Sequence, residues 1–280
     1  MAGIRRKICI LLVLTLLVLL CFSLPAMAQV EEIHENDRIY YRLPDGSIAP
    51  EYWELRGEKD WYYVSKEGEP FRDTVIAAYD DNYYVFDKNG VMLRSQTIFK
   101  NGLSYVIDEN GAAHPEESEE ELLLQKHAAS IIAEITNESM SLTDKCNAIY
   151  DYLWQGFTFD AANDTNMDIL QSGLKGFDLR RGNCFVILSK AHYLYQAIGV
   201  KDMLVIGAEN GNSIGHWWSM VKVGDRYYHV DATPFDGFHG WNLVTTEELF
   251  TSSKKTEMTA YEHQFDESNY PKSYDWEEIQ

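Results

Sequence analysis

The chain has 280 residues, of which 45% are hydrophobic and 24% charged, and its formal net charge is −20. A surface this acidic repels nucleic acids and anionic lipids, so we expect neither as a partner. The length is sufficient for one large core or for two domains of modest size.

The first 28 residues are typical of a secretory signal peptide. Three basic residues, Arg5, Arg6 and Lys7, precede an apolar stretch over residues 8–20, and residues 26–28 (Ala-Met-Ala) offer a cleavage site of the A-x-A type. The apolar stretch is short for a stable membrane span, which needs about 20 apolar residues. We therefore expect cleavage after residue 28, no membrane span afterwards and a secreted or extracellular protein. An uncleaved anchor is the alternative.

Cleavage removes three positive charges and no acid, so the net charge changes from −20 to −23. It also removes Cys9 and Cys21, which leaves Cys146 and Cys184. Two cysteines are too few for a disulfide scaffold in an exported protein of this size. A Cys146–Cys184 disulfide stays as the structural alternative to any chemical role.

Residues 37–114 carry an internal repeat. Aromatic residues recur with spacings of 22, 21 and 21, and a glycine follows each at a similar offset. The repeated aromatic positions are Tyr40-Tyr41, Tyr62-Tyr63, Tyr83-Tyr84 and Tyr105, and the glycines are Gly46, Gly68, Gly90 and Gly111. A short aromatic strand followed by an Asp/Asn/Gly turn predicts one hairpin per repeat. A single hairpin cannot bury its face, so we expect the units to stack into a small solenoid.

The repeats resemble the cell-wall-binding repeats of Gram-positive surface proteins. The segment YYVFDKNGVM, residues 83–92, is the best match to their W-Y-Y-F-x-x-x-G-x-M pattern. In that family, grooves lined by Trp and Tyr bind choline or glucan. This segment holds only Trp53 and Trp61, so a spacer without a ligand is the alternative.

An acidic stretch over residues 115–121 marks a domain boundary, and two helices are predicted after it. Ser118 with Glu121 forms a capping box for a helix to about residue 136, and a second helix starts at Ser141 and ends at Gly156. The apolar stripe of the second helix includes Cys146, which predicts a buried core thiol.

Cys184 stands at the start of a further predicted helix that ends near Gly199, after a loop over residues 161–182. The first turn of a helix presents unpaired N–H groups and a partial positive charge, both of which favour a thiolate. The same N–H groups can hold the oxyanion that forms when a thiolate attacks an acyl carbon. The sequence therefore predicts a nucleophile at Cys184.

A hairpin after this helix supplies a candidate base. We expect a strand over residues 203–206, a loop over 207–215, and strands over 216–223 and 226–231 joined by Gly224-Asp225, a tight-turn dipeptide. This register places Trp218 opposite Asp231 and makes His216 a diagonal neighbour of Asp231 on the same face. An imidazole and a carboxylate can meet at that spacing, so Asp231 would orient His216 and His216 would take the proton of Cys184.

At these residues the chain resembles the transglutaminase-like superfamily. The segments RGNCFVILSKAHYLYQAIGV and GHWWSMVKVGDRYYHVDATP carry its G-x-C, H-x-W and Y-x-V-D-x-T motifs, and the resemblance covers roughly residues 141–250. It implies a papain-like α+β fold, in which a helix packs on an antiparallel sheet. It also implies that Cys184, His216 and Asp231 are the nucleophile, base and orienting carboxylate.

There are three alternative sites: a serine-hydrolase elbow, a competing histidine base and a zinc site. Residues 211–215 match the G-x-S-x-G elbow of serine hydrolases, but that elbow needs a following helix and a strand is predicted here. His229 shares the predicted face of Asp231 and could compete as base. A zinc site built on Cys184 lacks further ligands at a regular spacing.

We predict two domains after the signal peptide: a β-hairpin repeat module over residues 37–114 and a transglutaminase-like catalytic domain over residues 116–280. The expected reaction is thiol-mediated acyl transfer at peptide amides, with hydrolysis of protein or cell-envelope peptides favoured and cell-wall peptidoglycan a candidate partner. Protein crosslinking and a non-catalytic wall-binding or adhesion role are the alternatives. No metal and no organic cofactor is expected.

Overall fold

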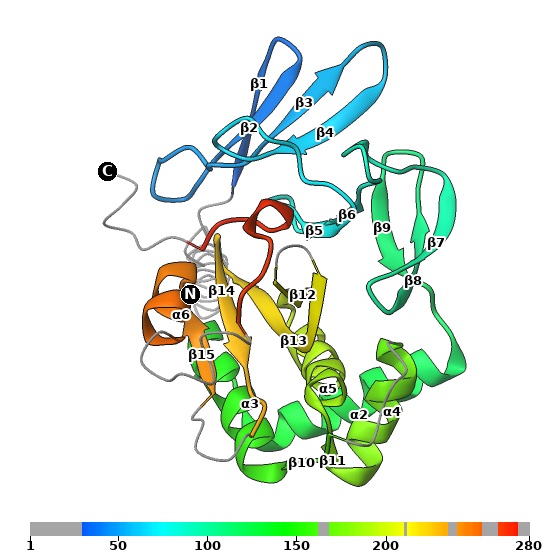
Figure 1. Cartoon of the computed structure of the whole chain (residues 1–280), viewed down its shortest axis with the longest axis vertical. Helices are drawn as coiled ribbons and strands as arrows, with labels where there is room; N and C mark the ends of the chain where they lie inside the picture. The colour runs from blue at the N-terminus through cyan, green and yellow to red at the C-terminus, as the bar shows by residue number, and fades with distance from the viewer. Residues whose placement is uncertain (1–29, 162–167, 210–211, 235–239, 254–262, 274–280) are drawn as a thin grey trace, which may run out of the picture.

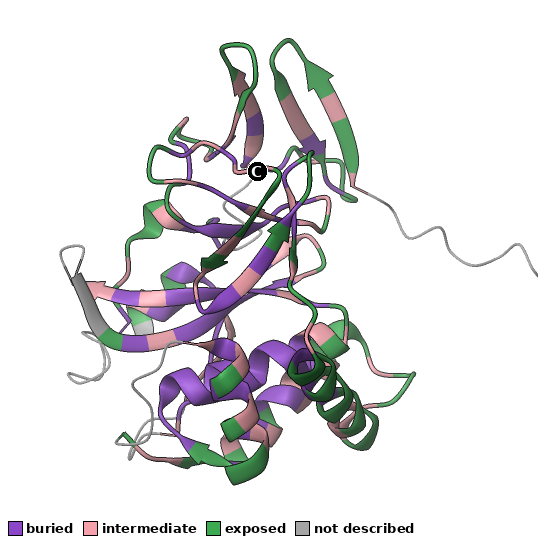
Figure 2. Cartoon of the chain, turned by 90° about the vertical axis from the view of Figure 1, so that its right-hand side faces the viewer, coloured by how far each residue is buried: buried purple, intermediate pink, exposed green. Residues whose placement is uncertain are grey.

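The computed structural model describes residues 30–161, 168–209, 212–234, 240–253 and 263–273 (Figure 1). The predicted signal peptide lies outside these residues. In Figures 1 and 2, N-terminal hairpins lie at one end, helices lie at the other, and a sheet lies between them. In the described part of the chain, we find no helix with the length and apolar character needed to span a membrane.

The N-terminal hairpins form two antiparallel sheets, with strand orders β1-β2-β3-β4 and β5-β6-β9-β8-β7. The strands of the first sheet are β1 (Glu31–Glu35), β2 (Arg38–Arg42), β3 (Tyr52–Arg56) and β4 (Asp60–Val64). Those of the second are β5 (Val75–Ala77), β6 (Tyr83–Val85), β7 (Gln96–Lys100), β8 (Leu103–Ile107) and β9 (Ala112–Pro115). The repeats are thus divided between two sheets, where the sequence predicted one continuous stack.

The hairpin in each repeat is confirmed. Isolated bridges join Arg42 to Ile48, Val64 to Pro70 and Phe86 to Met92, at the same place in three successive repeats. The four repeat glycines have φ between +86° and +95°. A residue with a side chain rarely adopts that backbone conformation, which explains why glycine recurs at this turn position.

Of the four helices longer than ten residues in the described ranges, three were predicted. They are α2 (Glu119–Ile135), α3 (Leu142–Gly156) and α5 (Cys184–Ala197). Ser141 and Asp144 form a complete capping box at α3. At α2 only half of the predicted box forms, because Glu121 is buried and accepts a hydrogen bond from the Tyr193 hydroxyl at 2.7 Å.

The fourth helix, α4 (Ile169–Leu179), lies in the stretch predicted as a loop. The prediction was wrong because the helix contains two glycines, which lower intrinsic helix propensity. Their lack of a side chain lets α4 approach α5 closely: a Cβ at Gly176 would lie 3.1 Å from the Val186 carbonyl oxygen. Tertiary packing therefore stabilises a helix that local sequence does not favour.

The central sheet is antiparallel with the order β12-β13-β14-β15. Its strands are β12 (Lys201–Glu209), β13 (Asn212–Val223), β14 (Arg226–Asp231) and β15 (Trp241–Val244). The predicted register is confirmed, since Val223 pairs with Arg226 and Ser219 with Val230. The loop predicted over residues 207–215 is mostly strand, because β12 and β13 continue their pairing beyond the apolar core. The remaining elements are β10 (Thr158–Phe159), β11 (Arg181–Gly182), α6 (Thr246–Ser253) and a 3-10 turn (Glu267–Asn269).

Helix α5 is the centre of the fold. Every residue from Cys184 to Tyr195 is buried, as expected for a helix covered on all sides. The α+β class and the helix-on-sheet arrangement agree with the prediction.

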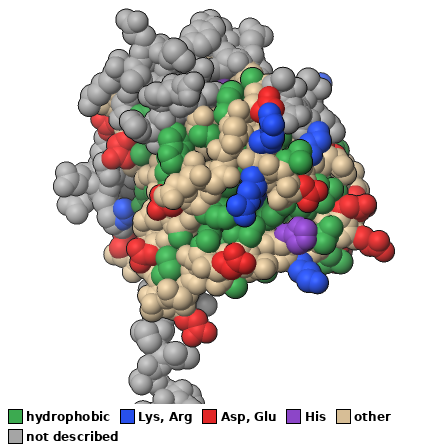
Figure 3. Space-filling view, turned by 90° about the horizontal axis from the view of Figure 1, so that it is seen from below, with side chains coloured by type: hydrophobic (Ala, Val, Ile, Leu, Met, Phe, Trp, Pro, Cys, Tyr) green, Lys and Arg blue, Asp and Glu red, His purple; other side chains and the backbone are tan. Residues whose placement is uncertain are grey.

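The end of the molecule formed by the helices carries acidic and basic side chains interspersed with hydrophobic ones (Figure 3). Among the exposed hydrophobic residues are Leu122 of α2 and Leu179 of α4.

The repeats pack directly on the central sheet. The Tyr227 hydroxyl of β14 donates to the Ala77 carbonyl at 2.6 Å, and the Lys222 ammonium of β13 donates to the Ala78 carbonyl at 2.9 Å. The buried hydrophobic core is continuous from the repeats into α5 and the sheet.

Candidate active site

Cys184 is the first residue of α5. The side chain of Asn183 caps the helix, accepting a hydrogen bond from the Val186 N–H at 3.1 Å. Gly182 makes this geometry possible, because a Cβ there would lie 2.6 Å from the Val186 Cβ. The thiol therefore lies at the positive end of a helix dipole, beside N–H groups that the helix itself does not use.

His216 lies on β13, and Asp231 ends the neighbouring strand β14. The His216 Nε2 donates to Asp231 Oδ2 at 2.8 Å, so the predicted diagonal contact is present. The Trp218 indole stacks on the imidazole, with ring centroids 5.6 Å apart and planes at 26°. Both members of the pair are buried, His216 being 4% and Asp231 2% exposed.

A hydrogen bond joins His216 to Cys184 and contributes to a raised pKa of the imidazole. Burial by itself would lower the pKa of His216, but the charge and hydrogen bond of Asp231, together with the contact to Cys184, outweigh it. Because Nε2 is engaged by Asp231, proton exchange with the thiol falls to Nδ1. The three predicted residues thus form one continuous chain of contacts.

Asp231 is held on both carboxylate oxygens. Oδ1 accepts from the Thr233 N–H at 2.9 Å, and Oδ2 accepts from His216 and from a second histidine, His263, each at 2.8 Å. Burial opposes ionisation of this carboxyl, but the two histidines hold its pKa well below the usual range. Asp231 is therefore an ionised carboxylate.

The sequence did not point to His263. It belongs to none of the three family motifs and lies 32 positions beyond Asp231 in the chain. Its ring packs on Trp218, with centroids 5.1 Å apart, and on His216, with centroids 5.0 Å apart. Two positions further along, Phe265 packs on Trp218 as well. An aromatic residue two positions from a histidine is the only local hint, and it is a weak one.

The rival histidine His229 occupies a different network. The Trp218 indole donates to its Nδ1 at 3.0 Å, so its proton is on Nε2, which donates to the Thr246 hydroxyl at 3.1 Å. Burial and the nearby His263 lower the pKa of His229 to about 3, which keeps it neutral. It orients Trp218, and its role as a competing base is not supported.

Neither the serine-hydrolase elbow nor the Cys146–Cys184 disulfide forms in the described residues. Ser213 of the G-x-S-x-G sequence lies within β13, and no helix follows it in this described segment, so the elbow geometry is absent. Cys146 and Cys184 are both free thiols. Cys146 is buried in α3 as predicted, and burial raises its pKa to about 12.

The ligating atoms of His216, Asp231 and His263 lie within 4.8 Å of one another, a cluster with the composition of a metal site. Both imidazoles, however, are at hydrogen-bonding distance from the same carboxylate oxygen. A metal would have to replace both hydrogen bonds, and it would occupy the nitrogen through which Asp231 orients His216.

Residues 129–232 match the family model of the transglutaminase-like superfamily. The chain contains a transglutaminase-like domain. The match includes Cys184, His216 and Asp231, and it ends one residue after the last of them. No curated protein matches the chain.

Several solved structures resemble parts of the chain. A TGase has 14% identity, covering 49% of this chain and 38% of its own, with a TM-score of 0.36. A protein from Cytophaga hutchinsonii, proposed to be a cysteine protease, has 14% identity, covering 43% and 42% of the two chains, with a TM-score of 0.34. The chain thus spans less than half the length of either.

A further solved structure also resembles part of the chain. The choline-binding domain of a Streptococcus pneumoniae protein has 22% identity, covering 33% of this chain and 99% of that domain, with a TM-score of 0.19.

Proposed function

We propose that the protein is an exported cysteine enzyme in which Cys184, His216 and Asp231 transfer the acyl group of a peptide amide through a thioester. The observation that supports this most directly is the contact chain itself. A thiol at a helix start is hydrogen-bonded to His216, whose Nε2 lies 2.8 Å from an ionised Asp231.

In the first step, the Cys184 thiolate attacks the amide carbon and a tetrahedral oxyanion forms. Unpaired N–H groups of the first turn of α5 are suited to stabilise this charge. The carbon–nitrogen bond then breaks, and His216 delivers the proton that it took from the thiol to the leaving amine. The products are a free amine and a thioester on Cys184.

In the second step, water attacks the thioester, with His216 taking one of its protons. The carbon–sulfur bond breaks, and the carboxylic acid and the free thiol are released. A primary amine in place of water would give a new amide, which is protein crosslinking. We propose hydrolysis of protein or cell-envelope peptides as the reaction, with crosslinking as the alternative.

The triad is tested by the alkylation of Cys184 with iodoacetamide. We expect fast alkylation near neutral pH, and a loss of at least about tenfold in His216→Ala, since an unassisted thiol titrates near 8.5. Peptide mass spectrometry separates Cys184 from Cys146, whose raised pKa makes it an internal slow control. Equal rates at the two cysteines would refute the enzymatic role and favour a non-catalytic wall-binding protein.

The acceptor is tested by incubating the protein with casein or with peptidoglycan fragments. Hydrolysis releases new peptides, whereas crosslinking produces ε-amide-linked products of higher mass. Both activities must be lost in Cys184→Ser. Crosslinked products without released peptides would contradict hydrolysis.

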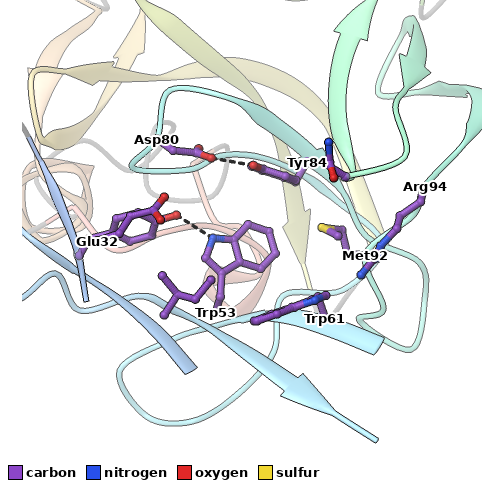
Figure 4. Close-up of a pocket in the computed structure, with 10 residues that line it drawn as sticks. Glu32, Trp53, Trp61, Asp80, Tyr84, Met92 and Arg94 are labelled. Carbon is purple, nitrogen blue, oxygen red and sulfur yellow. Dashed lines mark hydrogen bonds between the residues drawn. The ribbon is translucent and has the colours of Figure 1, made fainter. Parts of the chain in front are cut away.

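We also propose that residues 37–114 are a module that attaches the enzyme, over residues 116–280, to a cell-wall polymer. A pocket of about 200 Å³ lies among the repeats (Figure 4). Trp53, Trp61 and Tyr84 line it together with the carboxylates of Glu32 and Asp80. Aromatic faces beside negative charge are suited to a quaternary ammonium group such as choline.

This attachment is tested by titrating the protein with choline and following tryptophan fluorescence. We expect saturable quenching that Trp61→Ala removes, and Trp241→Phe in the catalytic part is the matched control for loss of one tryptophan. No saturable change, together with no retention on cell walls, would assign the repeats a spacer role.

A further inference from the structure

His263 is a buried histidine that the catalytic steps above do not use. Its side chain is fully buried, and its Nε2 lies 2.8 Å from Asp231 Oδ2. His216 binds the same oxygen at the same distance. Two imidazoles therefore compete for one carboxylate oxygen in a water-poor environment.

His263 gives the Asp231 carboxylate a contact in addition to those with His216 and Thr233. The Thr233 N–H holds Oδ1, whereas His216 and His263 both hold Oδ2, and the planes of the two imidazoles are at 79° to each other. With both oxygens held, the carboxylate cannot turn away when His216 gains or loses its proton. Fixing the orientation of catalytic groups in this way is a common role of surrounding hydrogen bonds.

We propose that His263 is a positioning residue, which fixes the Asp231 carboxylate and withdraws part of its negative charge from His216. This inference rests on the proposed triad. Its effect has the same sign for either charge state of His263, because a neutral N–H donor and an imidazolium both draw charge from Oδ2. In either state, His216 holds its proton less tightly and returns it more readily to the leaving amine.

Other titratable groups surround His216 and Asp231 and could also affect the pKa of His216. Cys184 faces His216 from α5, and His229 lies beyond Trp218 on β14. Burial, and then the charge of Asp231, raise the pKa of the Tyr150 hydroxyl on α3. His229 is neutral and Tyr150 is protonated at neutral pH, since burial shifts both away from their charged forms. The charge that His216 senses is then set by Cys184, Asp231 and His263.

The test compares His263→Phe with His263→Gln in protein labelled with ¹³C-histidine. Phenylalanine fills the space without a donor, whereas the glutamine amide nitrogen can take the place of Nε2 and donate to Asp231. We expect His263→Phe to raise the apparent pKa of His216 by about half a pH unit or more. The substitution removes a hydrogen bond to the charged Asp231, and such a bond is stronger than the free energy that corresponds to one pKa unit. His263→Gln should keep the wild-type titration.

His192→Phe is the matched control for removing a buried histidine that binds an aspartate. His192 Nδ1 lies 2.8 Å from Asp202 Oδ1, and the residue is 4% exposed. This variant should leave the titration of His216 and the alkylation rate of Cys184 unchanged. If His263→Phe and His263→Gln lower the alkylation rate equally without shifting the His216 titration, His263 is only a packing residue and the inference is overturned.

A measurement on the wild-type protein remains decisive if the variants do not fold. The ¹⁵N spectrum of labelled histidine must show His263 Nε2 protonated between about pH 5 and 9, where Asp231 is ionised. An unprotonated Nε2, or stoichiometric Zn²⁺ in the purified protein at this cluster, would overturn the inference. Slow alkylation of wild-type Cys184 would instead refute the proposed function, whatever the titration of His216 shows.

Discussion

The hydroxyl of Tyr83 and the backbone of Asp202 exchange two hydrogen bonds. The hydroxyl donates to the Asp202 carbonyl and accepts from the Asp202 N–H, each at 3.0 Å. A side chain of the repeats thereby satisfies both backbone groups of a residue in β12. This contact links the repeat that contains Tyr83-Tyr84 to β12. Strand β12 pairs with β13, and His216 lies on β13.

We expect Tyr83→Phe to destabilise the whole protein. The substitution removes one hydroxyl and leaves a buried N–H and a buried C=O without this partner, at about 1–3 kcal/mol for a buried unsatisfied group. Urea denaturation followed by fluorescence measures the change. Tyr40→Phe, on a tyrosine of the first repeat that is not fully buried, is the control and should shift the midpoint little. An unchanged midpoint in Tyr83→Phe would show that the contact between Tyr83 and Asp202 does not contribute to stability.

Gly182→Ala is expected to affect the thiol more than the fold. The added Cβ would overlap the Val186 Cβ at 2.6 Å, so the first turn of α5 must move away from β11. Overpacking of this kind destabilises by about 1–3 kcal/mol, and it displaces Cys184, two residues along. We predict at least about a tenfold slower alkylation of Cys184, because a misplaced thiol loses its contact with His216.

Gly156→Ala is the matched control for Gly182. This glycine also ends an element, α3, but a Cβ there meets nothing within 4 Å. Its alkylation rate should equal that of the wild type. Equal rates in both variants would mean that the start of α5 does not set the reactivity of Cys184.

Substitutions of Cys146 are expected to change the stability of the protein but not the reactivity of Cys184. The thiol is fully buried in α3, and its pKa is raised to about 12 by burial. Cys146→Ser buries a hydroxyl in its place, which we expect to destabilise by about 1–3 kcal/mol, whereas Cys146→Ala leaves only a small cavity and should destabilise less. Neither substitution should change the alkylation rate of Cys184. A change in that rate would indicate coupling between α3 and the start of α5.

The site was predictable where short-range rules determine geometry. The Gly224-Asp225 turn fixes the register of β13 and β14, so the approach of His216 to Asp231 follows from counting residues. The capping position of Asn183 places Cys184 at a helix start in the same way. These rules act over a few residues and need no knowledge of the rest of the fold.

The remaining features depend on contacts between distant segments. Helix α4 forms because glycines allow it to pack on α5, which its own sequence does not reveal. His263 reaches Asp231 through the path of the chain after the sheet, where no periodic pattern marks it. The repeats are divided into two sheets, and β5 and β6 of the second sheet contact β14 and β12. Repeat spacing carries no information about these distant strands.

We expect Glu51 to give the protein a pH dependence of stability that does not involve Cys184, His216 or Asp231. The carboxyl is 2% exposed and accepts hydrogen bonds from the Tyr79 hydroxyl at 2.9 Å and the Lys272 N–H at 3.3 Å. Burial outweighs these bonds and raises its pKa from 4.5 to about 7. Since the folded state then binds the proton more tightly than the unfolded state, stability falls as pH rises from about 4.5 to about 7.

Glu51→Gln should remove this dependence, because the amide stays neutral and still offers a hydrogen-bonding oxygen. At one pKa unit per 1.36 kcal/mol, the raised pKa corresponds to roughly 3 kcal/mol lost by the wild type between pH 4.5 and pH 8. Urea midpoints of both proteins at pH 5 and pH 8 isolate the contribution of Glu51, since the histidines and the other carboxyls titrate alike in the two. We expect the variant to gain on the wild type as pH rises. A constant difference between the two proteins at both pH values would mean that Glu51 is ionised throughout, with its charge balanced inside the fold.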